Sequence, residues 1–195
     1  MVHKTPLTFS DRLSALPGGE HLRQCYACGT CVSRCLVQER LEPAYNPRRL
    51  IKKAALDLEA DTFADCTVWL CSACNLCLAG CPQQVAISEL ILAIRKLALA
   101  AGHSGPVSPA RVNALTCVAC GLCAAACPYE AVTLQSVNVM GRKKTIAQVD
   151  PAACMACGLC AALCRSASIG PSARETNATL MQDLRHWLQT EEEEP

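Results

Sequence analysis

The sequence predicts two consecutive small domains, the first mainly helical and the second of mixed helix and strand, an α + (α+β) class. A cysteine quartet spaced CxxCxxCxxxC occurs four times, twice in each half of the 195 residues. A stretch rich in Gly, Pro and Ser, residues 101–109, separates the halves and indicates a linker. Apolar residues recur at helical spacing before the linker and alternate with polar residues after it. We therefore expect domains at residues 1–104 and 105–195, with the boundary near Gly105.

Two helices are expected in the first domain. Asn46-Pro47 is typical of an N-cap followed by proline at the first helical position. The apolar positions that follow it at helical spacing are Leu50, Ile51, Ala54, Ala55 and Leu58. Ser88 is the expected cap of the second helix, which should end near Gly102. The apolar stripe of this second helix contains Leu90, Ile91, Ile94, Leu97 and Ala98.

A β-hairpin is expected in the second domain. Residues 131–139 alternate apolar and polar side chains, residues 140–144 (MGRKK) supply a turn, and the apolar pattern resumes up to Asp150-Pro151. Residues 176–190 carry one apolar face and are expected to form a C-terminal helix. The run of four glutamates that follows, residues 191–194, is expected to be a solvated acidic tail, with electrostatic docking as the alternative.

Seventeen cysteines in 195 residues exceed ordinary usage so far that metal or disulfides must explain them. Residues 1–21 contain no apolar run of signal-peptide length, so we expect a cytoplasmic location. Closely spaced thiols in a reducing cytosol are metal ligands more often than disulfides. The most apolar stretch, residues 87–101, is interrupted by charges and is shorter than the roughly 20 residues needed to cross a bilayer, so no direct membrane insertion is expected.

The spacing of the quartets favours 4Fe-4S cubane clusters. Three cysteines two residues apart wrap a loop around one cluster, while the fourth faces away and binds the other cluster of the pair. Four clusters are therefore expected, two in each domain. The predicted first-domain ligand sets are Cys25, Cys28, Cys31 with Cys81, and Cys71, Cys74, Cys77 with Cys35. The predicted second-domain sets are Cys117, Cys120, Cys123 with Cys164, and Cys154, Cys157, Cys160 with Cys127.

Structural zinc and a disulfide scaffold are the alternatives to iron. Zinc sites usually combine two separated CxxC pairs, and a third cysteine at the same spacing has no place in the tetrahedron. The bacterial-type run ends in Cys-Pro, which Cys81 and Cys127 obey and which Cys35 and Cys164 do not. The remaining Cys66 is expected to be a buried small apolar residue rather than a ligand.

Charge and motifs exclude several other functions. The formal net charge of +1 gives no support to nucleic-acid binding, and four oxidised clusters of about −2 each would bring the loaded protein to roughly −7. The sequence contains no GxGxxG, P-loop or nucleophile elbow. Its four histidines are scattered along the chain. We therefore expect no catalytic residue in this chain, and the chemistry to belong to the clusters and to partners.

Two resemblances follow from these motifs. The segments CYACGTC, YNPRRLIKKAAL and VWLCSACNLCLAGCP resemble the C subunit of heterodisulfide reductase, which implies an α-helical ferredoxin fold for the first domain. The segments CVACGLCAAACPYEAVTL and VDPAACMACGLC resemble a bacterial-type ferredoxin with two 4Fe-4S clusters. The fusion of the two departs from the C subunit, which typically ends after the first module, and this leaves the substrate of a complex open.

The resemblance implies an electron-transfer subunit in anaerobic metabolism. It would relay electrons between a flavin-containing partner, similar to the A subunit of these reductases, and a cysteine-rich catalytic partner, similar to their B subunit. A soluble ferredoxin or a dehydrogenase is a further candidate partner. The alternatives are the iron-sulfur subunit of another flavin- or molybdopterin-linked dehydrogenase and, from a different class, a zinc-stapled interaction scaffold.

Overall fold

The computed structural model describes residues 7–40, 42–106 and 108–170. The chain divides into two compact units, residues 1–106 and 107–195, each of which is described by itself. The predicted C-terminal helix at 176–190 and the acidic run at 191–194 lie outside the described residues.

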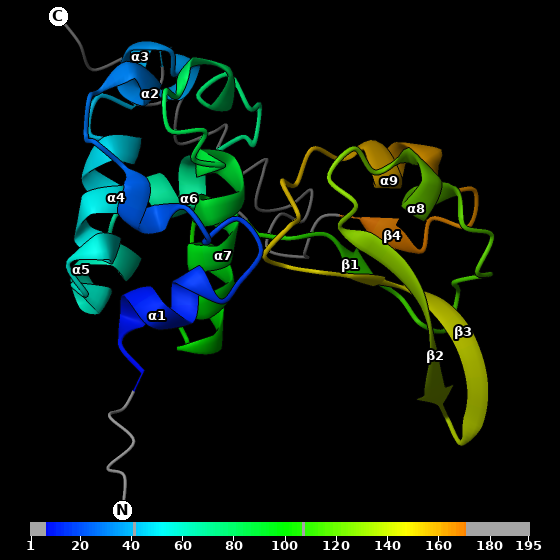
Figure 1. The fold of residues 1–195 in the computed structure, drawn as a ribbon. Coiled ribbons are helices and arrows are strands. Elements are labelled where there is room, and N and C mark those ends of the chain that lie inside the picture. Colours follow the sequence, from blue (N-terminus) through cyan, green and yellow to red (C-terminus); the bar gives the residue numbers. More distant parts are fainter. Residues whose placement is uncertain (1–6, 41, 107, 171–195) are drawn as a thin grey trace, which may run out of the picture. The chain divides into compact units, whose positions relative to one another are not determined.

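The first unit is built from helices around one hydrophobic core (Figure 1). The longest helix, α7, packs against α1, α5 and α6, while α4 packs against α5 and α6. The α-helices are α1 (Phe9–Ser14), α2 (Thr30–Ser33), α3 (Leu36–Arg40), α4 (Pro47–Ala55), α5 (Glu59–Phe63), α6 (Thr67–Leu70) and α7 (Ile87–Ala100), and the 3-10 turns are η1 (Leu22–Gln24) and η2 (Leu78–Gly80).

The start of α4 confirms the prediction. The Asn46 side chain accepts a hydrogen bond from the Arg49 backbone N–H at 3.0 Å, and Pro47 occupies the first helical position. The helix ends at Ala55, earlier than the apolar pattern indicated, because Asp57 adopts a left-handed φ of 59°. Leu58 therefore belongs to the start of α5 and not to α4.

The helix predicted after Cys81 is α7, but its predicted cap is wrong. The N-cap is Ala86, and no side chain caps the helix there. Ser88 lies in the first turn with its hydroxyl oxygen 3.7 Å from the sulfur of Cys77. The helix stops where expected: Gly102 has φ of 87°, its N–H bonds the Leu99 carbonyl, and the next N–H bonds the Ala98 carbonyl.

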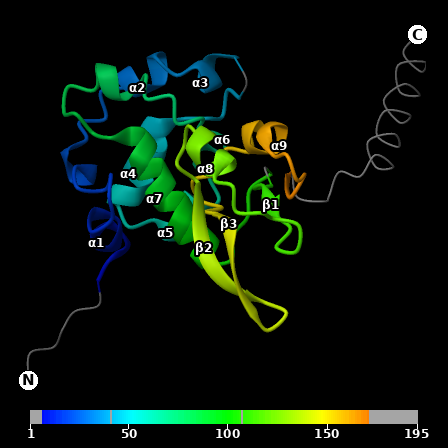
Figure 2. The same ribbon diagram turned by 90° about the vertical axis from the view of Figure 1, so that its right-hand side faces the viewer.

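The second unit combines two antiparallel strand pairs with two short helices (Figure 2). Strand β1 pairs with β4, and β2 pairs with β3 in the register Val132↔Val149 to Val139↔Arg142. The elements are β1 (Arg111–Val112), α8 (Leu122–Ala126), β2 (Val132–Val139), β3 (Arg142–Val149), α9 (Leu159–Leu163) and β4 (Ile169–Gly170).

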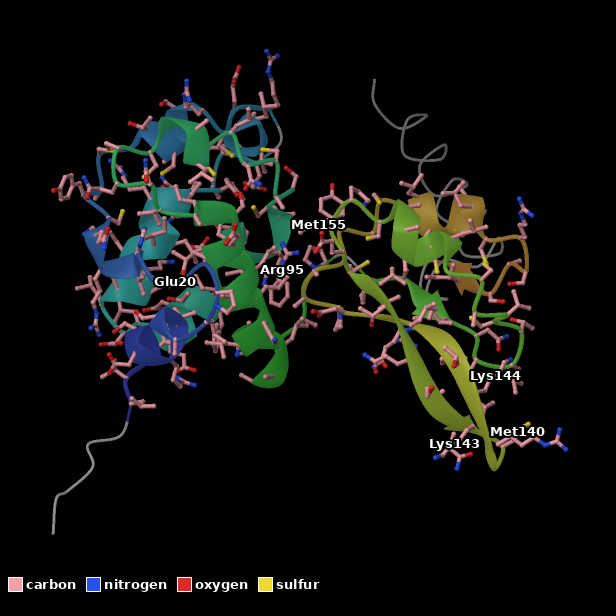
Figure 3. The ribbon with its side chains drawn as sticks, turned by 45° about the vertical axis from the view of Figure 1, so that its right-hand side comes forward. Glu20, Arg95, Met140, Lys143, Lys144 and Met155 are labelled. Carbon is pink, nitrogen blue, oxygen red and sulfur yellow. The ribbon has the colours of Figure 1, made fainter. Side chains whose placement is uncertain are left out.

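The hairpin β2–β3 confirms the predicted hairpin, with a shorter turn than expected. Met140 and Gly141 both have positive φ, the backbone that a two-residue hairpin turn requires, and β3 begins at once with Arg142. Figure 3 shows Met140 and Lys143 near the end of the hairpin. Lys144 anchors the hairpin, since its ammonium donates to the carbonyls of Ala114 and Leu115 at 2.8 and 2.7 Å.

Within the described part of the chain, no helix has the length and apolar character that a membrane span requires.

Candidate metal centres

The four cysteine loops share one backbone conformation. In each loop, the second residue after the first cysteine and the residue directly after the second cysteine have positive φ. These pairs are Ala27 and Gly29, Ala73 and Asn75, Ala119 and Gly121, and Ala156 and Gly158. Left-handed backbone is uncommon for alanine, so its recurrence at the same place in four loops marks a functional constraint. Alternating right- and left-handed residues turn successive N–H groups inward and make a concavity for an anionic group, an arrangement found at many Fe–S sites.

The loops continue differently after their fourth cysteine. Gln84, Glu130 and Ala167 each lie three residues after a fourth cysteine and have positive φ near 50°. The run ending at Cys164 thus turns like the two Cys-Pro runs although it lacks proline. After Cys35 the chain instead enters α3 directly.

Two cavities in the first unit are each lined by four cysteines. The first, named here the Cys28 cavity, is lined by Cys25, Cys28, Cys31 and Cys81, together with Tyr26 and Arg48. The second, the Cys74 cavity, is lined by Cys35, Cys71, Cys74 and Cys77, together with Arg34, Tyr45 and Ser88. In both cavities, three cysteines come from one quartet and the fourth from the other.

The second unit contains a larger cavity of about 180 Å³, named here the Cys157 cavity. It is lined by Cys127, Cys154, Cys157 and Cys160, and otherwise by mainly apolar residues that include Val132, Met155 and Leu159. The cysteine that comes from outside the main loop here is Cys127, which follows α8.

The remaining four cysteines of the second unit are Cys117, Cys120, Cys123 and Cys164, and Ser168 connects Cys164 to the residue before Cys117. The Ser168 hydroxyl donates to Thr116, the neighbour of Cys117, at 2.8 Å, and the Ser168 N–H donates to the Cys164 sulfur at 3.2 Å. Cys123 and Cys164 both pack against the small core that contains Cys117. These bonds hold the turn of Cys164 beside the loop of residues 117–123.

Burial raises the pKa of several cysteine thiols above the ordinary value. Burial, followed by the neighbouring cysteines, raises the pKa of Cys31 to about 11. Burial likewise raises the pKa of Cys77, Cys123 and Cys160. A bound metal reverses this preference, because a coordinating thiol is deprotonated outright. The opposite case is Cys164, where hydrogen bonds from Ser166 and then from the Ser168 backbone lower the pKa to about 7.

The Cys74 cavity is lined by two buried hydroxyl-bearing side chains, Tyr45 and Ser88. Tyr45 is buried and lines the cavity beside Cys71. Burial and the nearby cysteine sulfurs raise the pKa of Tyr45 above its ordinary value, so its hydroxyl keeps its proton. Sequence reasoning missed Tyr45, because only the tertiary fold carries it from the start of α4 to the loop of Cys71.

Cys66 lines none of the three cavities described above. It is the half-buried N-cap residue of α6, and burial raises its pKa, followed by the charges of Asp65 and Glu42. All seventeen cysteines fall within the described residues, and each is a free thiol there. Within the described ranges, no group of three or more His, Cys, Asp or Glu side chains is arranged to bind a single metal ion.

The residues at these sites fit 4Fe-4S clusters in their donor chemistry. Each of the three cavities presents four cysteine sulfurs, which is the ligand set of a 4Fe-4S cluster. The left-handed residues of the loops suit the negative charge of a thiolate-bound cluster, because backbone of this kind can turn N–H groups toward an anion. Such a cluster supplies one-electron redox chemistry.

Comparison with known proteins agrees with this chemistry. Residues 21–85 and residues 116–168 each match a family described as the 4Fe-4S dicluster domain. Two curated relatives are both named as the C subunit of an H(2):CoB-CoM heterodisulfide,ferredoxin reductase. One, from Methanothermobacter marburgensis, is 36% identical over 64 residues, and the other, from Methanothermobacter thermautotrophicus, is 34% identical over 64 residues. The match spans 33% of this chain and 33% of each relative.

The chain therefore carries two 4Fe-4S dicluster domains, which makes it an iron-sulfur protein with an electron-transfer role. Over about a third of its length it is similar to the C subunits of the Methanothermobacter heterodisulfide reductases.

Proposed function

We propose that this chain binds four 4Fe-4S clusters through sixteen cysteines and relays electrons in a heterodisulfide-reductase-like complex. The observation that carries the proposal is the composition of the Cys28, Cys74 and Cys157 cavities, each of which combines three cysteines of one quartet with one of another. The fourth cluster is assigned to Cys117, Cys120, Cys123 and Cys164, which the bonds of Ser168 support. On this proposal, residues 1–104 form an α-helical ferredoxin module and residues 105–195 a bacterial-type ferredoxin domain.

The proposed partners are a flavin-containing subunit that supplies electrons and a cysteine-rich catalytic subunit that consumes them. The similarity to the C subunits of a heterodisulfide,ferredoxin reductase supports this assignment. Because the match covers only about a third of each relative, the iron-sulfur subunit of another flavin- or molybdopterin-linked dehydrogenase remains the second candidate. Stable copurification with a flavoprotein and a cysteine-rich chain favours the first candidate over the second.

The first test is the anaerobic iron, sulfide and zinc content of the purified chain, together with EPR of the dithionite-reduced protein. We expect about sixteen irons and sixteen sulfides per chain, with spin-coupled signals of reduced clusters. Cys66→Ala is the matched control and should leave these contents unchanged, while Cys74→Ser should lower them. Zinc at about four per chain without an EPR signal would overturn the redox function and leave an interaction scaffold.

A further inference from the structure

We propose that the cluster in the Cys74 cavity has a higher reduction potential than the clusters in the Cys28 and Cys157 cavities, and that Tyr45 and Ser88 raise that potential. The inference rests on the proposed function, since it requires that the cysteines of this cavity bind a cluster.

Two buried hydroxyl groups face the sulfurs of this cavity. Tyr45 is 2% exposed and Ser88 is 3% exposed. Tyr45 lines the cavity beside Cys71, with its hydroxyl near that thiol, and the Ser88 hydroxyl lies 3.7 Å from the sulfur of Cys77. A thiolate that binds iron has no proton to give and can only accept, so both hydroxyl groups donate to it. Two of the four ligands therefore receive a hydrogen bond from a side chain that water does not reach.

A buried cation adds to this effect. Arg95 extends from α7, as Figure 3 shows, and is 4% exposed. Its guanidinium donates to the carbonyls of Val68 and Trp69 at 2.9 and 3.2 Å, and to the carbonyl of Cys71 at 3.3 Å. The positive charge of Arg95 is thus held against the backbone of Cys71, one of the predicted ligands. Because Arg95 is buried, water and salt screen its charge only weakly.

The sign of the effect follows from the charge of the cluster. One-electron reduction adds a negative charge to the cluster and its thiolates. Hydrogen-bond donors and a nearby cation stabilise the reduced state more than the oxidised state, and they raise the potential. Tyr45, Ser88 and Arg95 act in the same direction.

The Cys28 and Cys157 cavities lack this combination. In the Cys28 cavity, Thr30 lies 3.4 Å from the sulfur of Cys28, but that cysteine and the lining Arg48 are both exposed, so solvent weakens their effect. Among the described residues that line the Cys157 cavity, none is Lys, Arg, Asp or Glu. Apolar surroundings disfavour an added charge, so this cluster has a lower potential than the cluster in the Cys74 cavity.

The test is an anaerobic redox titration of the full chain, followed by EPR, on wild type and on Tyr45→Phe and Ser88→Ala. Cys74→Ser marks the signal of this cluster, because substitution of the ligand alters or removes it. In wild type we expect the marked signal to be reduced before the signals that Cys28→Ser and Cys157→Ser identify in the same way. In Tyr45→Phe we expect the marked cluster to be harder to reduce. At a fixed solution potential, its ratio of reduced to oxidised form should fall about tenfold, which corresponds to a reduction potential lower by about 59 mV for one electron. Ser88→Ala should shift the same signal in the same direction.

The matched control is Tyr26→Phe, which removes the hydroxyl of an exposed tyrosine lining the Cys28 cavity and should leave the marked signal unchanged. Iron and sulfide are counted in every sample. Missing clusters in the wild type would count against the proposed function itself. Two results with full cluster content would overturn the inference alone. One is a marked signal that is reduced after the signal of the Cys28 or the Cys157 cavity, and the other is a marked signal that shifts in neither Tyr45→Phe nor Ser88→Ala.

Discussion

Asp65 connects several segments of the first unit through hydrogen bonds near the Cys74 cavity. Its carboxylate accepts hydrogen bonds from Lys53 at 2.7 Å and from the hydroxyl of Thr67 at 2.6 Å. That same hydroxyl accepts the backbone N–H of Asn46 at 3.0 Å, so the chain of bonds reaches the neighbour of Tyr45. Burial alone would raise the pKa of Asp65, but the bonds from Lys53 and Thr67 outweigh it, and the pKa lies below its ordinary value.

Asp65→Asn should therefore destabilise the first unit. It removes the charge that pairs with Lys53 and weakens two bonds from Thr67, at a cost of about 1–3 kcal/mol in the free energy of unfolding. The measurement is anaerobic thermal unfolding, followed by circular dichroism and by cluster absorption. Asp61→Asn is the matched control, because Asp61 is exposed in the preceding helix α5.

The pH dependence of this difference has a definite sign. A carboxylate whose folded pKa is lowered contributes stability above its unfolded pKa of about 3.9 and loses it as the pH falls through the folded pKa. The difference between wild type and Asp65→Asn should therefore be constant between about pH 6 and pH 8. A difference that shrank across that range would show that the carboxylate is not held ionised.

At the scale of elements, the sequence predicted the long helices and the hairpin but missed the short pieces. Asn46-Pro47 marked the start of α4 because capping is a local effect. Ser88 was misread as a cap because the packing of α7 turns its hydroxyl toward Cys77, a contact that no local pattern reveals. Helices of four or five residues inside the cysteine loops are too short for periodicity to detect.

Local sequence patterns likewise could not predict which side chains surround each candidate cluster site. The repeated spacing predicted which cysteines act together, and those ligand sets stay predictions until the metal content is measured. The pairing of β1 with β4 joins Arg111 to Gly170, a contact too distant in the sequence for any local signal. The roles of Tyr45 and Arg95 are of the same kind, since both reach Cys71 only in the folded unit.

Crossed ligation between the two loops of the second unit is testable at this scale. Cys127 follows α8 but lines the Cys157 cavity with the cysteines of the other loop. Cys127→Ser should therefore perturb the same EPR signal as Cys157→Ser and spare the signal that Cys120→Ser perturbs. Cys123→Ser, four residues earlier in the same loop, is the matched control and should behave like Cys120→Ser. If Cys127→Ser behaved like Cys120→Ser, each loop would bind its own cluster.

At the scale of the whole molecule, the two units differ in how much core they have without metal. Among the described residues, the buried hydrophobic cluster of the first unit contains nineteen residues, and that of the second unit contains four. The larger cluster includes fully buried side chains of α4 and α7, such as Leu50, Leu90 and Ile94. The four residues of the smaller cluster are Cys117, Val132, Ala147 and Ile169.

Iron removal should therefore unfold the second unit more completely than the first. Ordering a backbone costs about 1–2 kcal/mol per residue, and so small a core offsets little of that cost once the clusters are gone. After anaerobic chelation, hydrogen exchange read by mass spectrometry should show lost protection throughout β2–β3 and residual protection in α7. The untreated chain, exchanged in parallel, should be protected in both elements. Protection retained in the hairpin after complete iron removal would show that the second unit does not depend on its clusters. Protection lost from α7 at the same iron content as from the hairpin would show that the clusters, and not the apolar core, govern the stability of the first unit.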